Sequence, residues 1–248
     1  MASKKQTSGP YFGTIYTLGS PQVAEIISDS GFDWVLIDME HSTMSLDSVQ
    51  TAIQVMGEKI LKIVRVPGND EIWIKRVMDT GCDGILVPMV MCAEEAVKAV
   101  MSSRYPVDGR RSVGLTRAHR YGAGFNEYVS RANNDLIIMI QIEHIEAVSN
   151  IDSILKVKGI NSIFIGPYDL SASMGLTGQV NHPEVRSAID LIKKKCIKAG
   201  LAYGIFGMDP SSVLKEVEEG CTFVLCGIDT AILSKSYKNI LTGLKQGD

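Results

Sequence analysis

The sequence lacks the segments that direct a protein to a membrane. No apolar run approaches the roughly 18 residues that a membrane-spanning helix needs. The first ten residues, MASKKQTSGP, are polar and have no apolar core of the kind that a signal peptide carries. We therefore expect a cytoplasmic protein with no membrane partner.

The sequence also contains few cysteines and carries little net charge. Five cysteines are an odd number and none are spaced as C-x-x-C, which argues against both a disulfide framework and a zinc knuckle. The net charge of −3 provides no electrostatic basis for binding nucleic acid. No G-x-G-x-x-G motif follows the first apolar run, so nothing indicates a dinucleotide-binding fold.

What the sequence does have is a regular alternation of short, β-branched apolar runs with helix-like segments. Short apolar runs of this kind are typical of buried parallel strands. Eight strands alternating with eight helices predict a (β/α)₈ TIM-type barrel, an α/β fold, as one domain over residues 1–248; an open doubly wound sheet is the alternative. The eight expected strands are Tyr11 to Tyr16, Asp33 to Ile37, Leu61 to Val64, Gly84 to Val87, Leu136 to Ile142, Ile163 to Ile165, Leu201 to Ile205 and Thr222 to Leu225.

Residues 104–135 interrupt this alternation. The stretch carries six arginines, several glycines and little continuous apolar sequence. It predicts a long loop with a short helix near Glu127 to Ala132. Long loops in compact domains tend to carry function, so we expect a role in binding or in a subunit contact.

Two acidic residues follow the central pair of expected strands. Glu143 comes at the end of one strand, and Asp169 follows the Gly-Pro turn after the next. Because parallel strands end at the same edge of a sheet, the two carboxylates should face one another across a shared mouth. Carboxylate pairs suit Mg²⁺ or Mn²⁺. The alternative is a helix N-terminal acid and a turn acid with no metal role.

Two further polar residues lie at expected strand ends. Asp38 could hold the ring of His41 in one tautomer and make it a proton acceptor, unless His41 is an ordinary loop histidine. Arg65 is expensive to bury without an anion, and beside a metal it could stabilise an enolate oxygen. Its alternative is a salt bridge to a neighbouring loop carboxylate.

Together these residues predict enolate chemistry on a 2-oxo acid, with a proton removed or restored at C3. A Schiff-base mechanism would need a buried lysine at a strand end, and Lys62 lies near the start of its strand. A phosphosugar enzyme would need glycine-rich phosphate cradles after the last two strands. Gly207 and Gly227 are isolated, which counts against that class.

Seven motifs, in order between Asp33 and Asp229, resemble the HpcH/HpaI family of class II pyruvate aldolases. The resemblance implies a modified barrel that assembles as a hexamer or trimer, with the C-terminal helix exchanged between subunits. Met39 and Tyr168 depart from the small residues common in the family, which leaves the substrate open. The motifs are DWVLIDMEH, VRVPG, GILVPMV, RYPVDGRRSVG, IQIEH, GPYDLSASMG and HPEV.

The resemblance also implies how a substrate would be held. Glu143 and Asp169 would bind a divalent cation, Mg²⁺, Mn²⁺ or Co²⁺, and Gln141 would orient water on it. Pro167, Tyr168 and Asp169 would bind the pyruvate carboxylate through backbone N–H groups around Tyr168 and Asp169.

Four residues would be catalytic by the same resemblance. Arg65 would hold the keto or enolate oxygen, and His41 with Asp38 would act on the aldol hydroxyl. Asp79 matches a position where an adjacent subunit supplies an acid. The loop arginines Arg110, Arg111, Arg117 and Arg120 could bind an acidic or hydroxylated aldehyde, or form a solvated loop or subunit contact.

The implied activity is reversible cleavage of a 4-hydroxy-2-oxo acid to pyruvate and an aldehyde, through a pyruvate enolate formed at the metal. The partners are therefore a small 2-oxo acid, an aldehyde and further copies of the chain. Decarboxylation of oxaloacetate or citrate-lyase-like cleavage of an acyl-CoA could use the same site. A non-catalytic assembly partner is the remaining alternative, although no expected site residue is missing.

Overall fold

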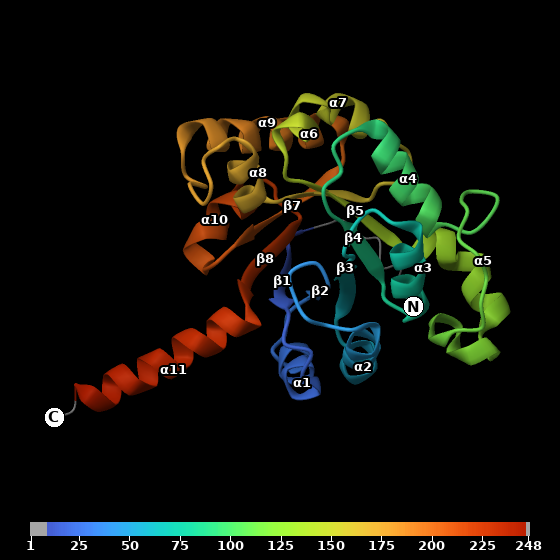
Figure 1. The fold of residues 1–248 in the computed structure, drawn as a ribbon, viewed down its shortest axis with the longest axis horizontal. Helices are drawn as coiled ribbons and strands as arrows, with labels where there is room; N and C mark the ends of the chain where they lie inside the picture. The colour runs from blue at the N-terminus through green and yellow to red at the C-terminus, as the bar shows by residue number, and fades with distance from the viewer. Residues whose placement is uncertain (1–8, 247–248) are drawn as a thin grey trace.

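Eight parallel strands close into a barrel in the order in which they occur in the sequence (Figure 1). We describe residues 9–246 of a computed structural model; most of the polar N-terminal segment considered above lies outside the described residues. The barrel confirms the expected fold class. Its strands are β1 (Tyr11–Tyr16), β2 (Trp34–Asp38), β3 (Leu61–Arg65), β4 (Gly84–Val87), β5 (Ile137–Ile142), β6 (Ser162–Ile165), β7 (Ala202–Gly207) and β8 (Phe223–Ile228).

Helices connect the strands and pack around the barrel. Within residues 9–246, none is both long and apolar enough to cross a membrane. The short helix expected near residues 127–132 is longer than predicted and is preceded by a 3₁₀ segment. The helices are α1 (Pro21–Asp29), α2 (Leu46–Met56), α3 (Glu71–Asp79), α4 (Ala93–Ser103), η1 (Arg117–Gly122), α5 (Phe125–Asp135), α6 (Ile145–Ser149), α7 (Ile151–Ile154), α8 (Pro167–Ser173), α9 (Pro183–Ala199), α10 (Pro210–Glu218) and α11 (Asp229–Lys245).

The barrel interior is filled by side chains from alternate strand positions. Trp34 is fully buried at its centre and makes edge contacts with Phe164 and Phe223, at ring-centroid distances of 6.2 and 5.5 Å. Gly13 lies against it, since a Cβ there would come within 2.6 Å of the indole Nε1. This packed interior closes the bottom of the barrel and leaves the carboxyl ends of the strands to form a mouth.

The register of the sheet brings polar strand ends together at that mouth. Asp38 at the end of β2 pairs directly with Arg65 at the end of β3. Gln141 near the end of β5 pairs with Phe164 of β6. Lys62 lies toward the opposite end, where its ammonium pairs with Asp83 at 3.0 Å. A Schiff-base role for Lys62 therefore has no support in the structure.

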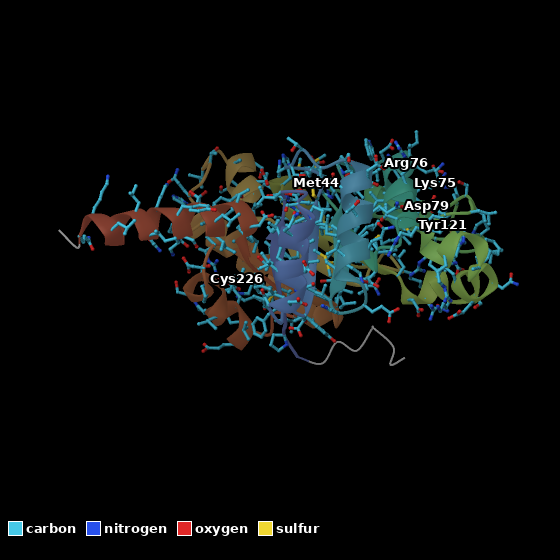
Figure 2. All side chains as sticks on the ribbon, turned by 90° about the horizontal axis from the view of Figure 1, so that it is seen from below. Met44, Lys75, Arg76, Asp79, Tyr121 and Cys226 are labelled. Atoms are coloured by element: carbon cyan, nitrogen blue, oxygen red, sulfur yellow. The ribbon has the colours of Figure 1, made fainter. Side chains whose placement is uncertain are left out.

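The last helix, α11, projects away from the barrel (Figures 1 and 2). Leu233, Tyr237, Ile240 and Leu244 recur at helical spacing along it and are exposed. An amphipathic helix normally buries such a stripe. In a single copy of the chain, the apolar stripe on α11 is exposed to solvent.

The arginine-rich excursion is anchored to the barrel by Arg111. Its side chain is 1% exposed and lies over the ring of Tyr105, 4.6 Å from the centroid. It also donates to Asp79 at 2.8 Å and to the Tyr128 hydroxyl at 3.1 Å. The expectation that Arg111 binds an aldehyde is therefore wrong for the barrel mouth of the same chain. The guanidinium is buried on the outer flank of the barrel.

We expect Arg111→Leu to destabilise the protein by about 3 kcal/mol, because it leaves Asp79 without its cation and Tyr128 without its donor. Urea unfolding followed by circular dichroism measures this. Arg110→Leu, at an exposed neighbouring position, should change stability by less than about 0.5 kcal/mol. An Arg111 variant with unchanged stability but a raised KM would contradict the anchoring role.

Candidate active site

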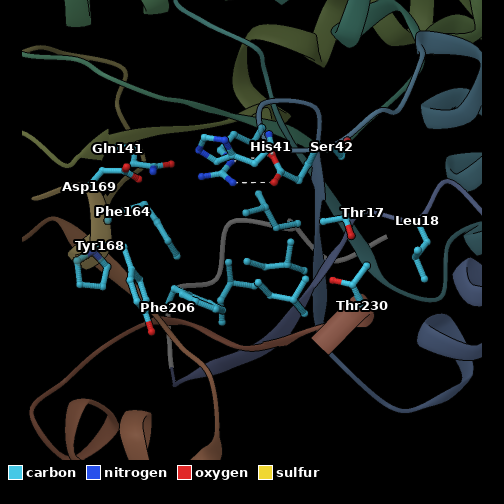
Figure 3. Close-up of a pocket in the computed structure, with 18 of the residues that line it drawn as sticks. Thr17, Leu18, His41, Ser42, Gln141, Phe164, Tyr168, Asp169, Phe206 and Thr230 are labelled. Carbon is cyan, nitrogen blue, oxygen red and sulfur yellow. Dashed lines mark hydrogen bonds and ion pairs between the residues drawn. The ribbon is translucent and has the colours of Figure 1, made fainter. Parts of the chain in front are cut away.

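A cavity of about 490 Å³ opens at the carboxyl ends of the strands (Figure 3). Most of the residues expected at the site lie in its wall. Glu143 and Asp79 do not. The lining comprises Ile15, Thr17, Leu18, Leu36, Asp38, His41, Ser42, Thr43, Arg65, Gln141, Phe164, Gly166, Pro167, Tyr168, Asp169, Phe206, Leu225, Ile228 and Thr230.

The geometry of the cavity is set by an ion pair between Arg65 and Asp38. The guanidinium donates from Nε to Oδ1 at 2.8 Å and from Nη2 to Oδ2 at 2.7 Å, and Nη1 lies 3.2 Å from Oε2 of Glu40. Burial opposes ionisation of Asp38, but the hydrogen bond and charge of Arg65 outweigh it, so the pKa of Asp38 lies below its ordinary value. Arg65 is thus held in one orientation.

The ring of His41 is not held by Asp38 in this structure. Asp38 Oδ1 instead accepts from the backbone N–H groups of Glu40, at 3.0 Å, and of His41, at 3.4 Å. The His41 side chain is 62% exposed, with Nε2 3.8 Å from the Glu40 carboxylate. Asp38 therefore fixes the loop after β2, and the exposed ring of His41 lies at the rim beside Glu40. Contrary to our expectation, Asp38 does not hold the imidazole ring of His41.

Glu143 lies just behind the cavity wall and is 2% exposed. Its Oε1 accepts from the backbone N–H of Met89 at 2.7 Å, and its Oε2 accepts from the Gln141 side chain. Met89 has a φ of 52°, a left-handed conformation that is uncommon outside glycine. The loop after β4 therefore adopts an unfavourable backbone conformation to hold this carboxylate.

Asp169 faces the cavity from the first turn of α8, which begins directly after Gly166. Gly166 separates the two expected metal ligands: a Cβ there would lie 2.8 Å from Cβ of Glu143 and 3.0 Å from Nε2 of Gln141. Only glycine lets the chain pass this close to both side chains. The expected Gly-Pro turn is thus the start of a helix.

Negative charge exceeds positive charge at this end of the cavity. Burial raises the pKa of Glu143 to about 7, with Met89 opposing and the Glu40 and Asp169 carboxylates adding to the shift. Burial also raises the pKa of Glu40 to about 7, against the opposing charge of Arg65 and with help from Asp38 and Asp169. Repulsion of this kind between buried carboxylates is relieved by a bound cation.

The donor atoms also fit a divalent cation. Gln141 Oε1 is buried with no hydrogen-bond partner, and Glu40 Oε2 is buried with an ion pair to Arg65 but no hydrogen bond. Among residues 9–246 no three His, Cys, Asp or Glu side chains form a ready-made metal cluster. A site with two carboxylates, its other positions filled by water and substrate, matches the preference of Mg²⁺ and the octahedral oxygen sites of Mn²⁺.

Sequence reasoning gave no role to Glu40 or to Met89. The position of Glu40 between Asp38 and His41, directly after the second strand, could have indicated that it belongs to the site. Met89 acts through its backbone N–H, and its side-chain chemistry gives no sign of this. Phe206 and Thr230 also line the cavity, from β7 and from the first turn of α11, and were not expected there.

The fold and the cavity define a TIM-barrel enzyme whose site is a carboxylate-rich mouth at the strand ends. A family model, HpcH/HpaI aldolase/citrate lyase, matches residues 14–236. The 4-hydroxy-2-oxo-heptane-1,7-dioate aldolase of Shigella flexneri is 40% identical over 230 residues, covering 92% of this chain and 86% of the relative.

Solved structures agree with this match. An HpcH/HpaI aldolase/citrate lyase family protein from Burkholderia cenocepacia J2315 superposes with a TM-score of 0.93 at 28% identity, covering 97% of this chain and 96% of the other. Citrate synthase SbnG gives 0.86 at 28% identity, covering 97% and 95%. The chain belongs to the HpcH/HpaI aldolase/citrate lyase family, as its motifs predicted, and is a carbon–carbon lyase.

The raised pKa values predict how the metal-free protein responds to pH. Glu40 and Glu143 hold their protons more tightly in the folded state than at their ordinary value of 4.5. Stability from these groups is therefore fully present below about pH 4.5 and is lost as the pH rises through about 7. We expect the Tm measured in EDTA to fall between pH 5 and pH 8.

Glu143→Gln is the matched control, since it keeps the shape and removes the charge. Its Tm in EDTA should fall less over the same range, and Mn²⁺ should raise the Tm of the native protein at pH 8 more than that of the variant. Equal slopes for the two proteins would show that Glu143 is not under electrostatic strain.

Proposed function

We propose that the protein is a divalent-metal-dependent aldolase that reversibly cleaves a 4-hydroxy-2-oxo acid to pyruvate and an aldehyde. The observation that carries the proposal is an arginine held by Asp38 at the mouth of the barrel, beside three further carboxylates, Glu40, Glu143 and Asp169, with no second arginine or lysine among the lining residues that the structure describes. Membership of an aldolase family supports it.

Glu143 and Asp169 are the proposed metal ligands. When bound there, a Mg²⁺, Mn²⁺ or Co²⁺ ion would polarise the 2-oxo group and offset the charge that accumulates on its oxygen. Gln141 has a buried carbonyl oxygen without a partner beside Glu143, and this group would orient water at the site.

The chain's own residues position the 2-oxo acid. Arg65 would donate to the keto oxygen, and Asp38 keeps the guanidinium in place so that little reorganisation is needed on binding. The segment Pro167, Tyr168 and Asp169 opens α8, where backbone N–H groups lack partners within the helix. Those of Tyr168 and Asp169 would receive the pyruvate carboxylate.

His41 would exchange the proton of the aldol hydroxyl. In the cleavage direction the C4 hydroxyl gives its proton to the imidazole, directly or through water, while the C3–C4 bond breaks and its electron pair passes to the pyruvate fragment. The exposed ring at the rim can reach the aldehyde end of a substrate. The Glu40 carboxylate lies 3.8 Å from Nε2 of the ring.

Assembly of several copies is part of the proposal. The exposed apolar stripe of α11 would pack on another subunit through exchange of this helix in a trimer or hexamer. Asp79 lies at the end of α3, on the flank of its own barrel beside Arg111 (Figure 2), and does not line its own cavity. It would act only on a neighbouring subunit's site.

The central test is exchange of the C3 protons of pyruvate in D₂O, followed by NMR. We expect exchange with Mg²⁺, Mn²⁺ or Co²⁺ and none in EDTA. Glu143→Ala and Asp169→Ala should reduce the rate by about a hundredfold or more, because each removes one of two carboxylate ligands. Retained exchange in both variants would refute the metal assignment.

His41 provides a second arm of the same experiment. Because His41 is assigned to the aldol hydroxyl, His41→Ala should lower aldol cleavage by about 10²–10⁴-fold and spare pyruvate exchange. Equal loss of both activities would place His41 in the enolisation step instead.

A second candidate function uses the same site for oxaloacetate or an acyl-CoA ester, and the similarity to citrate synthase SbnG favours testing it. Oxaloacetate decarboxylation and acyl-CoA cleavage are measured beside aldol cleavage. A kcat/KM for either that exceeds the aldol value would replace the aldolase assignment.

The assembly is tested on the α11 stripe. Light scattering should show a trimer or hexamer for the native chain and smaller species for Leu233→Glu with Ile240→Glu, because charges on the stripe oppose its burial. Lys238→Glu, an exposed position off the stripe, is the control. A monomeric native chain would contradict helix exchange.

A further inference from the structure

The cavity has two chemically different ends (Figure 3). Gln141, Asp169 and the Arg65–Asp38 pair lie at the end assigned above to the 2-oxo acid. Apart from His41 at the rim, the rest of the wall is apolar or carries neutral hydroxyl groups. Its apolar side chains are Ile15, Leu18, Leu36, Phe164, Phe206, Leu225 and Ile228.

An aromatic wall connects the two ends. Tyr168, next to Asp169, lies against Phe206 with ring centroids 6.2 Å apart and the planes inclined by 49°. Tyr168 is 43% exposed, so its ring can still bury surface against a ligand. An apolar chain extending from the reacting carbon would cover these rings.

Four hydrogen-bond donors at the far end of the cavity are already engaged by one carboxylate. Thr17 and Thr230 mark this end in Figure 3. The backbone N–H groups of Thr17, Leu18 and Thr230 donate to the Asp229 carboxylate at 2.9, 3.0 and 2.8 Å, and the Thr17 hydroxyl donates to it at 2.6 Å. Asp229 is 5% exposed. A buried carboxylate therefore stands directly behind the far wall.

No cation balances that carboxylate inside the cavity. Among the lining residues that the structure describes, the basic side chains are Arg65 and His41. Arg65 is engaged by Asp38, and His41 lies at the rim. A second carboxylate on the substrate would lose its hydration at the far end, meet a negative charge and find no free donor among the groups bound to Asp229.

We infer that the far half of the cavity selects an uncharged, apolar acceptor aldehyde and discriminates against an aldehyde that carries a distal carboxylate. The inference rests on the proposed aldolase function and adds the chemical class of the acceptor. The inferred acceptor differs from that of relatives named for a 1,7-dioate, a substrate with a carboxylate at each end.

The test compares butanal with 4-oxobutanoate as acceptors for pyruvate under saturating Mn²⁺. The two share a four-carbon chain and differ in the terminal group. We expect kcat/KM for butanal to exceed that for 4-oxobutanoate by about tenfold or more. Equal values, or a preference for 4-oxobutanoate, would overturn the inference.

A gain of function separates charge selection from simple loss of packing. Thr230→Lys places a cation at the far end, where it either faces the ligand or neutralises Asp229. It should raise kcat/KM for 4-oxobutanoate about tenfold relative to the native protein, and neutral Thr230→Val should not. If Thr230→Lys leaves the ratio of the two aldehydes unchanged, the charge argument is wrong.

Truncating the aromatic wall tests its apolar contribution. Phe206→Ala should lower kcat/KM for butanal about tenfold. Phe12→Ala, a similar truncation near the start of β1 and away from the mouth, should leave it unchanged. Equal effects of the two truncations would count against acceptor binding at Phe206.

Pyruvate proton exchange distinguishes failure of the acceptor preference from failure of the aldolase assignment. Exchange without the expected aldehyde preference would leave the aldolase assignment standing and reject the acceptor class. Absence of both exchange and aldol turnover with every metal would reject the aldolase assignment and the acceptor class together.

Discussion

The site depends on the ion pair that holds Arg65 at the mouth of the barrel. The pair forms because β2 and β3 are adjacent and in register, so Asp38 and Arg65 end their strands side by side. A largely buried guanidinium needs a fixed anion, and Asp38 meets that need with both carboxylate oxygens. Burial raises the pKa values of Glu40 and Glu143, and repulsion from the Asp169 carboxylate adds to both shifts, a combination that suits a divalent cation.

Five aromatic residues pack the barrel interior or line the cavity. Trp34, Phe164 and Phe223 pack the barrel interior beneath the mouth, and Tyr168 with Phe206 forms one wall of the cavity. The packed interior supports strand ends that carry the polar groups. A rigid base of this kind allows charged side chains to be held in fixed positions without a large reorganisation on binding.

Much of the fold could be predicted because parallel strands leave a direct trace in the sequence. The apolar runs located all eight strands to within a few residues, and the parallel geometry correctly placed Asp38, Arg65 and Asp169 at one mouth. Glu143 directly follows its strand at the same edge but lies behind the wall. The arginine-rich segment 104–135 was harder to predict, because the sequence does not distinguish its buried arginine from its exposed ones. Arg111 is buried against Tyr105, whereas Arg110 is exposed.

The sequence alone determined the barrel, the order of its strands and which polar residues follow them, because periodic burial and strand polarity are local properties of the chain. Which charges are paired depends on the three-dimensional arrangement of the elements. Asp38 holds Arg65 and not the His41 ring, Met89 directs its N–H to Glu143, and Asp229 uses the donors behind the far wall. These outcomes depend on distances between separate elements, which register and loop conformation set and which no local pattern records.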